Sequence, residues 1–539
     1  MRLNQQISAR LASGAGVIVL LCVSASGRQV FASEQQTAPR VVAPLAAPQQ
    51  PTGPEVRLTA DEAVKMALEN NLAVQSERLG PRIGTLNVAQ ARALFVPRLQ
   101  SLTSTRSSTS PPDFLANAGA TDTTTSDRVF TTVGVAQNMR WGGGNYSFGI
   151  DGSKTTVNYT SSFNPQLNSN MNFNFTQPLL RNFTIDAGRQ QLMIAENDED
   201  IATIQLRQQL VATERVTRNA YFDLILSIGQ LEVSKQSLEL ARESLRQNER
   251  RVEVGTMAQI DILEAQAEVS RVEESVIIAE AGIKSAEDNL RTLILNPQQP
   301  DYWTARLVPT ERPTLTPQPV DVEGAVAKAL ADRTDLAQIR KQLESTQINI
   351  DFAHNQKLPD VNLIAAYNTV GVAGTQFRFG GETFPPVVVD QTQRGFADAL
   401  RDVFGNNFKT WSLQLQINYP IGTSAAEAGY ASSRLQREQQ QNTLRDTELN
   451  VTAQVREAGR QVNTALQRVE STTRARQFAE RRLEAEQKRL NVGLSTTFQQ
   501  FQAQRDLANV KQQELRAVID YNRALVNFQA VQQAPLGGR

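Results

Sequence analysis

The sequence of 539 residues contains one cysteine, Cys22, and one histidine, His354. Intramolecular disulfide bonds and Cys–His nucleophile pairs are therefore excluded, and one histidine without ligand partners does not predict a metal site. The run Gly142–Gly144 is not followed by a Lys-Ser/Thr pair, so it predicts a turn and not a phosphate-binding loop. We expect no cofactor, no metal and no enzymatic activity.

Charge imbalance and long apolar runs are also missing. The chain carries 55 basic and 55 acidic residues, so nothing in its charge predicts a nucleic-acid partner. After the N-terminal region, no stretch approaches the roughly 20 uninterrupted apolar residues that a membrane-spanning helix needs. Any membrane crossing must therefore be made by strands.

Residues 1–32 have the layout of a secretory signal peptide, with basic residues and no acid ahead of an apolar run at 11–23. Small residues place the cleavage site after Ala32, with Ser26 as the alternative. Lipidation at Cys22 is disfavoured, because a leucine precedes it where a lipid-acceptor motif has a small residue. The following segment, 33–57, is rich in Pro, Gln and Ala and predicts an extended tether.

The remainder of the chain consists of two copies of one unit. Ala63-Val64 recurs as Ala325-Val326, and the same offset of 262 carries Pro97 to Pro359. Further along, the offset becomes 238 and carries Gly255 to Gly493. The first repeat is predicted at 58–295, with strands about 98–178 and a helical hairpin at 187–295. A linker at 296–319 follows. The second repeat is predicted at 320–533, with strands about 360–420 and a hairpin at 424–533, and a tail occupies 534–539.

Heptad spacing of apolar residues predicts that each repeat contains a long antiparallel helical hairpin. The pattern occupies Leu224, Leu231, Leu238, Leu245 and Val252 on one helix, Ile262, Val269, Val276, Ile283 and Leu290 on the returning helix, and Val462, Val469, Leu483 and Leu490 in the second repeat. Arg476 is the one break. We expect the turns at Gly255 and Gly493, because glycine permits the backbone conformation that ends a helix.

Alternating strands lead into both hairpins. Met171, Phe173 and Phe175 share one face before the first, and Trp411 and Leu413 share one face before the second. In a soluble sandwich such a face packs inward, whereas in a membrane barrel it meets lipid. We expect four to six strands, at 99–105, 129–137, 145–151, 170–176, 361–367 and 410–419. Since the smallest single-chain membrane barrels have about 8 strands, several protomers must share one barrel.

These residues together resemble the TolC family of outer-membrane efflux channels. The matching motifs are Ala63–Asn71, Thr176–Leu180, Arg251–Gly255 with Asp261–Gln266, and the second-copy Tyr419–Ile421 and Arg489–Gly493. The resemblance implies an α+β fold in which an outer-membrane β-barrel, shared by a homotrimer, continues into an α-helical coiled-coil barrel in the periplasm. Four strands per chain would give twelve in the trimer and six would give eighteen.

The resemblance also implies partners, namely outer-membrane lipid, a periplasmic adaptor protein and an inner-membrane pump. We expect the adaptor to dock at the two hairpin turns, through Arg251, Val254, Gly255, Thr256, Arg489, Val492, Gly493 and Leu494. Candidate gate residues near the closed end are Asp261, Gln499 and Gln502. The simpler interpretation is that the glycines only end helices and the arginines only cap them.

Two functions follow from these observations. The first is a passive exit duct of a tripartite efflux or type I secretion system, driven by a separate pump. The alternative is a structural periplasmic coiled-coil protein of the envelope, without transport activity. The two differ in whether Phe173, Phe175, Trp411 and Leu413 face lipid.

Overall fold

The computed structural model describes residues 54–111, 123–311, 317, 319–381, 387–422 and 424–536. The predicted signal peptide, its cleavage site, Cys22 and most of the predicted tether lie outside the described residues. The chain divides into two units, residues 1–51 and 52–539. Everything that follows concerns the second unit.

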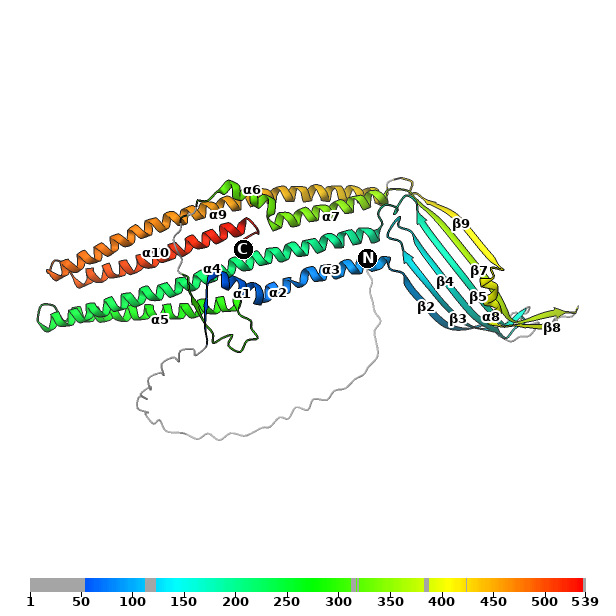
Figure 1. Ribbon diagram of the computed structural model, residues 1–539, viewed down its shortest axis with the longest axis horizontal. Helices are drawn as coiled ribbons and strands as arrows, with labels where there is room; N and C mark the ends of the chain where they lie inside the picture. Colours follow the sequence, from blue (N-terminus) through cyan, green and yellow to red (C-terminus); the bar gives the residue numbers. More distant parts are fainter. Residues whose placement is uncertain are drawn as a thin grey trace, which may run out of the picture. The chain divides into compact units, whose positions relative to one another are not determined.

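The second unit contains the two predicted copies in chain order (Figure 1). The first copy comprises β1 (Glu55–Leu58), α1 (Ala60–Asn70), α2 (Leu72–Glu77), α3 (Leu79–Arg92), the short 3₁₀-helix η1 (Ala93–Phe95), β2 (Arg98–Ser110), β3 (Thr124–Asn138), β4 (Asn145–Val157), β5 (Phe163–Pro178), α4 (Ala187–Glu253) and α5 (Ile260–Ile294). The second comprises β6 (Arg306–Pro309), α6 (Val322–Asp332), α7 (Thr334–Gln356), β7 (Asp360–Gly380), β8 (Val387–Arg394), α8 (Phe396–Phe404), β9 (Lys409–Asn418), α9 (Ala425–Asn491) and α10 (Thr497–Val531).

The large sheet is antiparallel, in the order β2-β3-β4-β5-β7. Both β9 and β8 pair with β7, β9 along its first half and β8 along its last residues. The sheet therefore contains seven strands, one more than the predicted maximum of six, and it is six strands wide because β8 and β9 pair with different parts of β7. Sequence analysis missed β8 and α8, because a short strand and a nine-residue helix between two expected strands leave little periodicity to read.

The predicted alternation of the strands is confirmed. Register places Leu99, Val135, Phe148, Phe173, Tyr367 and Trp411 in one row across six strands. Phe173 is 39% exposed and Trp411 71% exposed, so this apolar face has no cover in the chain along most of its length. On the opposite face, Asn170 and Asn172 donate to Asp151 at 2.8 and 3.0 Å. An apolar face open to the surroundings and a polar face of hydrogen-bonded side chains are what a membrane barrel wall requires.

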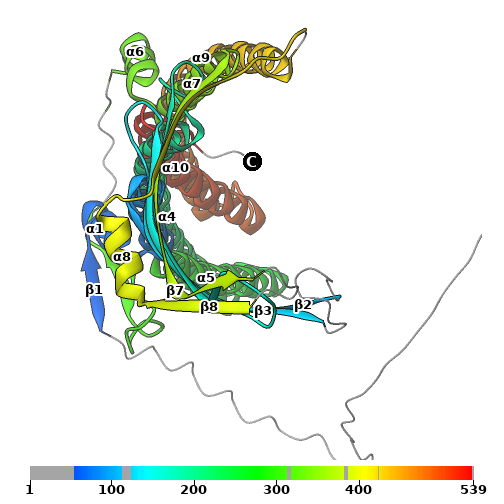
Figure 2. The ribbon, with the colours of Figure 1, turned by 90° about the vertical axis from the view of Figure 1, so that its right-hand side faces the viewer.

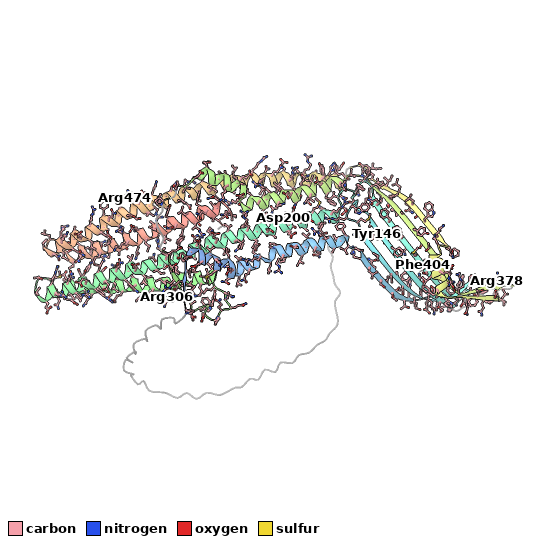
Figure 3. The ribbon with its side chains drawn as sticks, viewed as in Figure 1. Tyr146, Asp200, Arg306, Arg378, Phe404 and Arg474 are labelled. Atoms are coloured by element: carbon pink, nitrogen blue, oxygen red, sulfur yellow. The ribbon has the colours of Figure 1, made fainter. Side chains whose placement is uncertain are left out.

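The two helical hairpins have equal dimensions. Helices α4 and α9 are each 67 residues long, about 100 Å at 1.5 Å per residue, and α5 and α10 are each 35 residues long. Each hairpin packs around its own buried cluster, with Tyr221, Leu224 and Leu290 in the first and Val462, Val469 and Phe528 in the second. Figure 3 shows side chains of the first hairpin, such as Asp200, and of the second, such as Arg474, pointing away from the helix axes.

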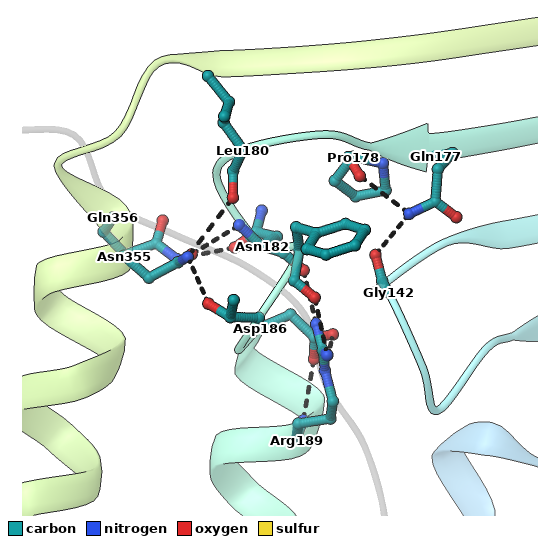
Figure 4. Close-up of polar contacts among 11 residues, drawn as sticks. Gly142, Gln177, Pro178, Leu180, Asn182, Asp186, Arg189, Asn355 and Gln356 are labelled. Carbon is teal, nitrogen blue, oxygen red and sulfur yellow. Dashed lines mark hydrogen bonds and ion pairs between the residues drawn. The ribbon is translucent and has the colours of Figure 1, made fainter.

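A polar network joins the loop that follows β5 to α4 and to α7 (Figure 4). Asp186 caps α4 by accepting from the Arg189 N–H at 2.9 Å, and the Arg189 side chain donates back to Asp186 at 2.7 Å and to the Asn182 carbonyl at 2.6 Å. The Asn182 N–H in turn donates to the Asn355 side chain of α7 at 2.6 Å. Backbone groups that lose their partners where a strand becomes a helix are thereby satisfied.

The folded region begins earlier than predicted. Residues 55–57, assigned above to the tether, form β1, which pairs in parallel with β6 from the predicted linker. The strand was missed because four residues are too few to show a strand pattern. Its backbone hydrogen bonds are made with a partner strand about 250 residues away in the sequence. Within the predicted tail, Ala534 is 1% exposed and packs as part of the structure.

Candidate functional site at the hairpin tips

Both hairpins turn through the same backbone motif. Gly255 has φ +74° and Gly493 has φ +79°, which confirms the prediction that glycine ends α4 and α9. In the first turn the Gly255 N–H donates to the Val252 carbonyl at 2.9 Å and the Thr256 N–H to the Arg251 carbonyl at 2.8 Å. This pair of bonds is a Schellman motif, and it satisfies carbonyls that a helix end would leave unpaired.

The surface of the two tips is apolar and open. Val254, Val492 and Leu494 are 72%, 68% and 70% exposed. A side chain added at either glycine would meet no atom within 4 Å. The tips are thus small hydrophobic caps that nothing in the described chain covers.

The two arginines beside the tips have different partners. Arg251 donates across to Asn491 of the other hairpin at 2.6 Å, whereas Arg489 pairs with Glu486 of its own helix at 3.0 Å. Glu486 also accepts from the Ser495 hydroxyl at 2.7 Å. Arg251 therefore connects the hairpins, and Arg489 stiffens only the end of α9.

Further contacts connect the hairpins just above the tips. Thr497 is 4% exposed, and its hydroxyl donates to Asp261 at 2.7 Å. Gln504 of α10 donates to Ser244 of α4 at 2.9 Å. Arg505 and Glu268 form an ion pair at 3.4 Å, with Glu268 only 7% exposed on its side chain. These contacts, together with Arg251–Asn491, are called the tip bridges below.

The three predicted gate residues do not behave alike. Asp261 joins the two hairpins, as just described. Gln499 accepts from Ser495, and Gln502 donates to Asp506 at 2.8 Å, so both bond only within the second hairpin. The structure brings Asp261 to the boundary between the hairpins and leaves the two glutamines along one of them.

Sequence reasoning did not single out Ser244 or Glu268, although the internal repeat carries a signal. At the offset of 238 they correspond to Arg482 and Asp506, which pair with each other at 2.9 Å inside the second hairpin. In the first hairpin the equivalent positions cannot form that ion pair, so Ser244 and Glu268 are free to bond with α10. Divergence between repeat copies therefore marks the residues that face the other hairpin.

Carboxylates near the tips are held in their charged form. The side-chain hydrogen bond from Arg246 lowers the pKa of Glu243 below its ordinary value, and the hydrogen bond from Lys488 does the same for Glu484. Within the described ranges, no three His, Cys, Asp or Glu side chains gather as metal ligands would. Nor does any described helix combine the length and the apolar composition that crossing a membrane requires.

Comparison with known proteins identifies the family. The model of the outer membrane efflux protein family matches residues 63–294 and 325–531, one segment in each copy, and the chain belongs to this family. Outer membrane protein TolC of Vibrio cholerae is 21% identical over 324 residues, covering 57% of this chain and 66%, just under two thirds, of that protein.

Solved structures share the fold. The outer membrane channel CmeC of Campylobacter jejuni superposes with a TM-score of 0.60 at 14% identity, over 88% of this chain and 85% of that one. The open state of the outer membrane channel MtrE of Neisseria gonorrhoeae gives 0.59 at 14% identity, over 88% and 89%. The predicted α+β fold is confirmed by these likenesses, and the predicted family by the family model.

Family membership also fixes class and location. The chain is an outer-membrane efflux channel protein and not an enzyme, with its strands at the outer membrane and its helices in the periplasm. The apolar face of the sheet is of the kind that meets lipid in an outer-membrane barrel.

Proposed function

We propose that the chain forms, as a homotrimer, the passive exit duct of a tripartite efflux or type I secretion system. The observation that carries this proposal is the open sheet. Among the described residues β2 pairs only with β3, and β9 only with β7, so both edges expose unpaired backbone groups. Such edges are not tolerated in lipid, and pairing with further copies removes them. Three six-strand sheets would close a barrel of eighteen strands.

The hairpin tips are the proposed docking site for a periplasmic adaptor, which in turn recruits the inner-membrane pump. Support comes from Val254, Val492 and Leu494, which form exposed apolar caps about 100 Å along the helices from the sheet. The docking residues would be those predicted above, namely Arg251, Val254, Gly255, Thr256, Arg489, Val492, Gly493 and Leu494. The energy for export would come from the pump.

Docking is tested by the double variant Gly255→Trp with Gly493→Trp. Both side chains would project into open space, and the positive φ at each site should cost only about 1 kcal/mol, so folding and membrane insertion should persist while export is lost. Efflux is measured in cells that depend on this protein, with insertion checked by membrane fractionation. Normal export by the inserted double variant would refute docking at the tips.

The tip bridges are the proposed lock of the periplasmic end. Opening requires the two hairpins to separate there, which breaks Arg251–Asn491 and Asp261–Thr497. Asp261→Ala with Arg251→Ala should raise single-channel conductance in planar bilayers severalfold. Gln499→Ala is the matched control, because the Gln499 side chain bonds only to Ser495 of its own hairpin. If the control and the double variant conduct alike, the tip bridges do not close the channel.

A further inference from the structure

A groove of about 630 Å³ lies on the apolar face of the sheet, beneath α8. Its floor is formed by Val129, Val133, Ile150 and Leu167 of β3, β4 and β5, and its wall by Phe396 and Leu400 of α8. This volume lies within the range of protein sites that bury a small molecule. The floor residues share the face of Phe148 and Phe173, which is the face that meets lipid.

The wall of the groove is held firmly in place. Ala399 and Val403 of α8 are fully buried against the sheet. At Gly371 an added Cβ would come within 1.9 Å of the Ala399 carbonyl oxygen, so the helix backbone rests directly on β7. Phe396 lies similarly close over Gly152, where a Cβ would meet its ring at 2.9 Å. Figure 2 shows α8 on the convex side of the curved sheet.

The groove ends at the depth of lipid headgroups. Tyr146 lies at the helix end of the sheet and Arg378 at the opposite end (Figure 3). Lys154, which lines the groove, is nine residues beyond Asn145 on β4, or about 30 Å along the strand. At a strand tilt of about 40° this is roughly 23 Å along the membrane normal, against an apolar band about 25 Å tall. With the Tyr146 ring taken as part of the inner aromatic belt, Lys154 therefore lies at the outer headgroup boundary.

Lys154 also lacks an acidic side chain to pair with. Its side chain is exposed and forms no ion pair within the described part of the chain. The acids of α8 are already paired, Asp398 with Arg401 at 2.7 Å and Asp402 with Arg394 at 2.6 Å. Asp127 lies on the same face one strand step farther out and is not bonded to Lys154. An unpaired ammonium at a headgroup boundary favours a phosphate.

We propose that this groove binds the phosphate-bearing glycolipid of the outer leaflet, with an acyl chain under Phe396 and Leu400 and a phosphate at Lys154. Strands β3 and β4 lie in the interior of the sheet, away from the edges available to other copies, so assembly leaves the groove open. Phe396, 42% exposed, places one aromatic ring at the groove. The proposal depends on the outer-membrane location and not on docking or gating.

The test uses the purified full chain in mild detergent, stripped of lipid, and native mass spectrometry. The probes are lipid A and the same lipid A after enzymatic removal of its phosphates. Wild type should bind lipid A in preference to the dephosphorylated form by about tenfold, and Lys154→Gln should abolish this preference. Lys409→Gln, on the same face outside the groove, should retain it.

Filling the groove should weaken the binding of both lipid probes. Val133→Trp occupies it, whereas Val135→Trp on the same face, two residues closer to the helices, does not line it. Leu400→Trp fills the groove from the opposite wall if Val133→Trp does not fold, with thermal unfolding as the check. Equal binding of both probes by wild type, Lys154→Gln and the filled variants would mean unspecific surrounding lipid and would overturn the proposal.

Discussion

The two repeat copies place different residues at one structural position. Asn71 and Arg333 are related by the offset of 262, and each lies at the start of the helix that leads to the sheet. Asn71 donates to the Leu293 carbonyl at 3.4 Å, and Arg333 donates to the equivalent Val531 carbonyl at 3.3 Å. A backbone carbonyl at the end of a hairpin thus keeps its donor while the donating side chain changes.

In the second copy, the side chain at this position is more deeply buried. Arg333 is 1% exposed, pairs with Asp335 at 3.0 Å and donates to Gln454 at 2.6 Å. Burial lowers the pKa of its guanidinium below the ordinary value, and the neighbouring Asp335 opposes that shift. The second copy therefore depends on a buried charge where the first uses a neutral amide.

Core volumes are exchanged between partner helices in a similar way. The first copy packs Tyr221 of α4 in the same cluster as Leu290 of α5. The second has Gly459 and Phe528 at these positions, and a Cβ at Gly459 would lie 3.6 Å from the Phe528 ring. A large side chain has moved from one helix to the other while the pair stays filled.

The two copies also differ at one heptad position and in the helices that lead into the sheet. Leu231 is half-buried beside a groove between the hairpins, whereas its counterpart Val469 is 1% exposed. The continuous α7 corresponds to the broken pair α2 and α3, where Pro81 lacks the N–H that an uninterrupted helix would use there. The comparison teaches that duplication preserved helix lengths and turns while interior contacts diverged.

The largest difference in stability between the copies is expected at the heptad position occupied by Leu231 and Val469. Val469→Asp would bury a carboxylate without a partner and should lower the free energy of unfolding by more than about 4 kcal/mol. Leu231→Asp, beside the open groove, should cost about 1–2 kcal/mol. Denaturant unfolding of the detergent-solubilised protein measures both. Equal losses would contradict the difference in burial.

The next largest difference in stability is expected when the side chain that donates to the hairpin carbonyl, Arg333 or Asn71, is removed. Arg333→Ala leaves the Gln454 oxygen, the Val531 carbonyl and Asp335 without their shared cation and should cost about 3 kcal/mol. Asn71→Ala removes a helix cap and should cost about 1 kcal/mol. Arg474→Ala, at an exposed arginine of α9 with no hydrogen bond or ion pair among the described residues, serves as the control in the same unfolding assay. A greater loss in Asn71→Ala would reverse the comparison.

The volume exchange predicts a coupled pair. Gly459→Leu should destabilise by about 1–3 kcal/mol, because its Cβ alone would approach a Val322 methyl to 2.8 Å and its longer side chain would crowd Phe528. Phe528→Leu should cost about 1 kcal/mol through lost packing. Together they should cost less than the sum of the two, by at least about 0.5 kcal/mol in a double-mutant cycle. Strict additivity would show that the two positions do not share their space.

The smallest difference should be at the tips, where the copies are alike. Gly255→Ala and Gly493→Ala each place a Cβ at positive φ and should each cost about 1 kcal/mol, within a few tenths of one another. Thermal unfolding of each single variant provides the measurement. A marked inequality would show that one turn carries strain that the other lacks.

Much of the fold could be predicted because its signals are local or repeated. Heptads need only a neighbouring helix, and a glycine followed by the next helix start marks a turn whatever surrounds it. Alternation at Met171–Phe175 and at Trp411–Ile417 fixes two faces wherever the strand lies. Of the candidate site, the turns at Gly255 and Gly493 followed from these signals, whereas Asp261 was named through the family resemblance and its bond to Thr497 was not predicted.

The sequence by itself determined the duplication, the strand-to-helix order, the equal hairpins and the family. Only the tertiary structure decided which polar residues cross between hairpins, such as Ser244 to Gln504, because that depends on which helix faces lie opposite. It also decided that Glu55–Leu58 is a strand and that α8 covers the sheet. These features rest on partners distant in the chain, whose hydrogen bonds and close contacts leave no periodic trace in the local sequence.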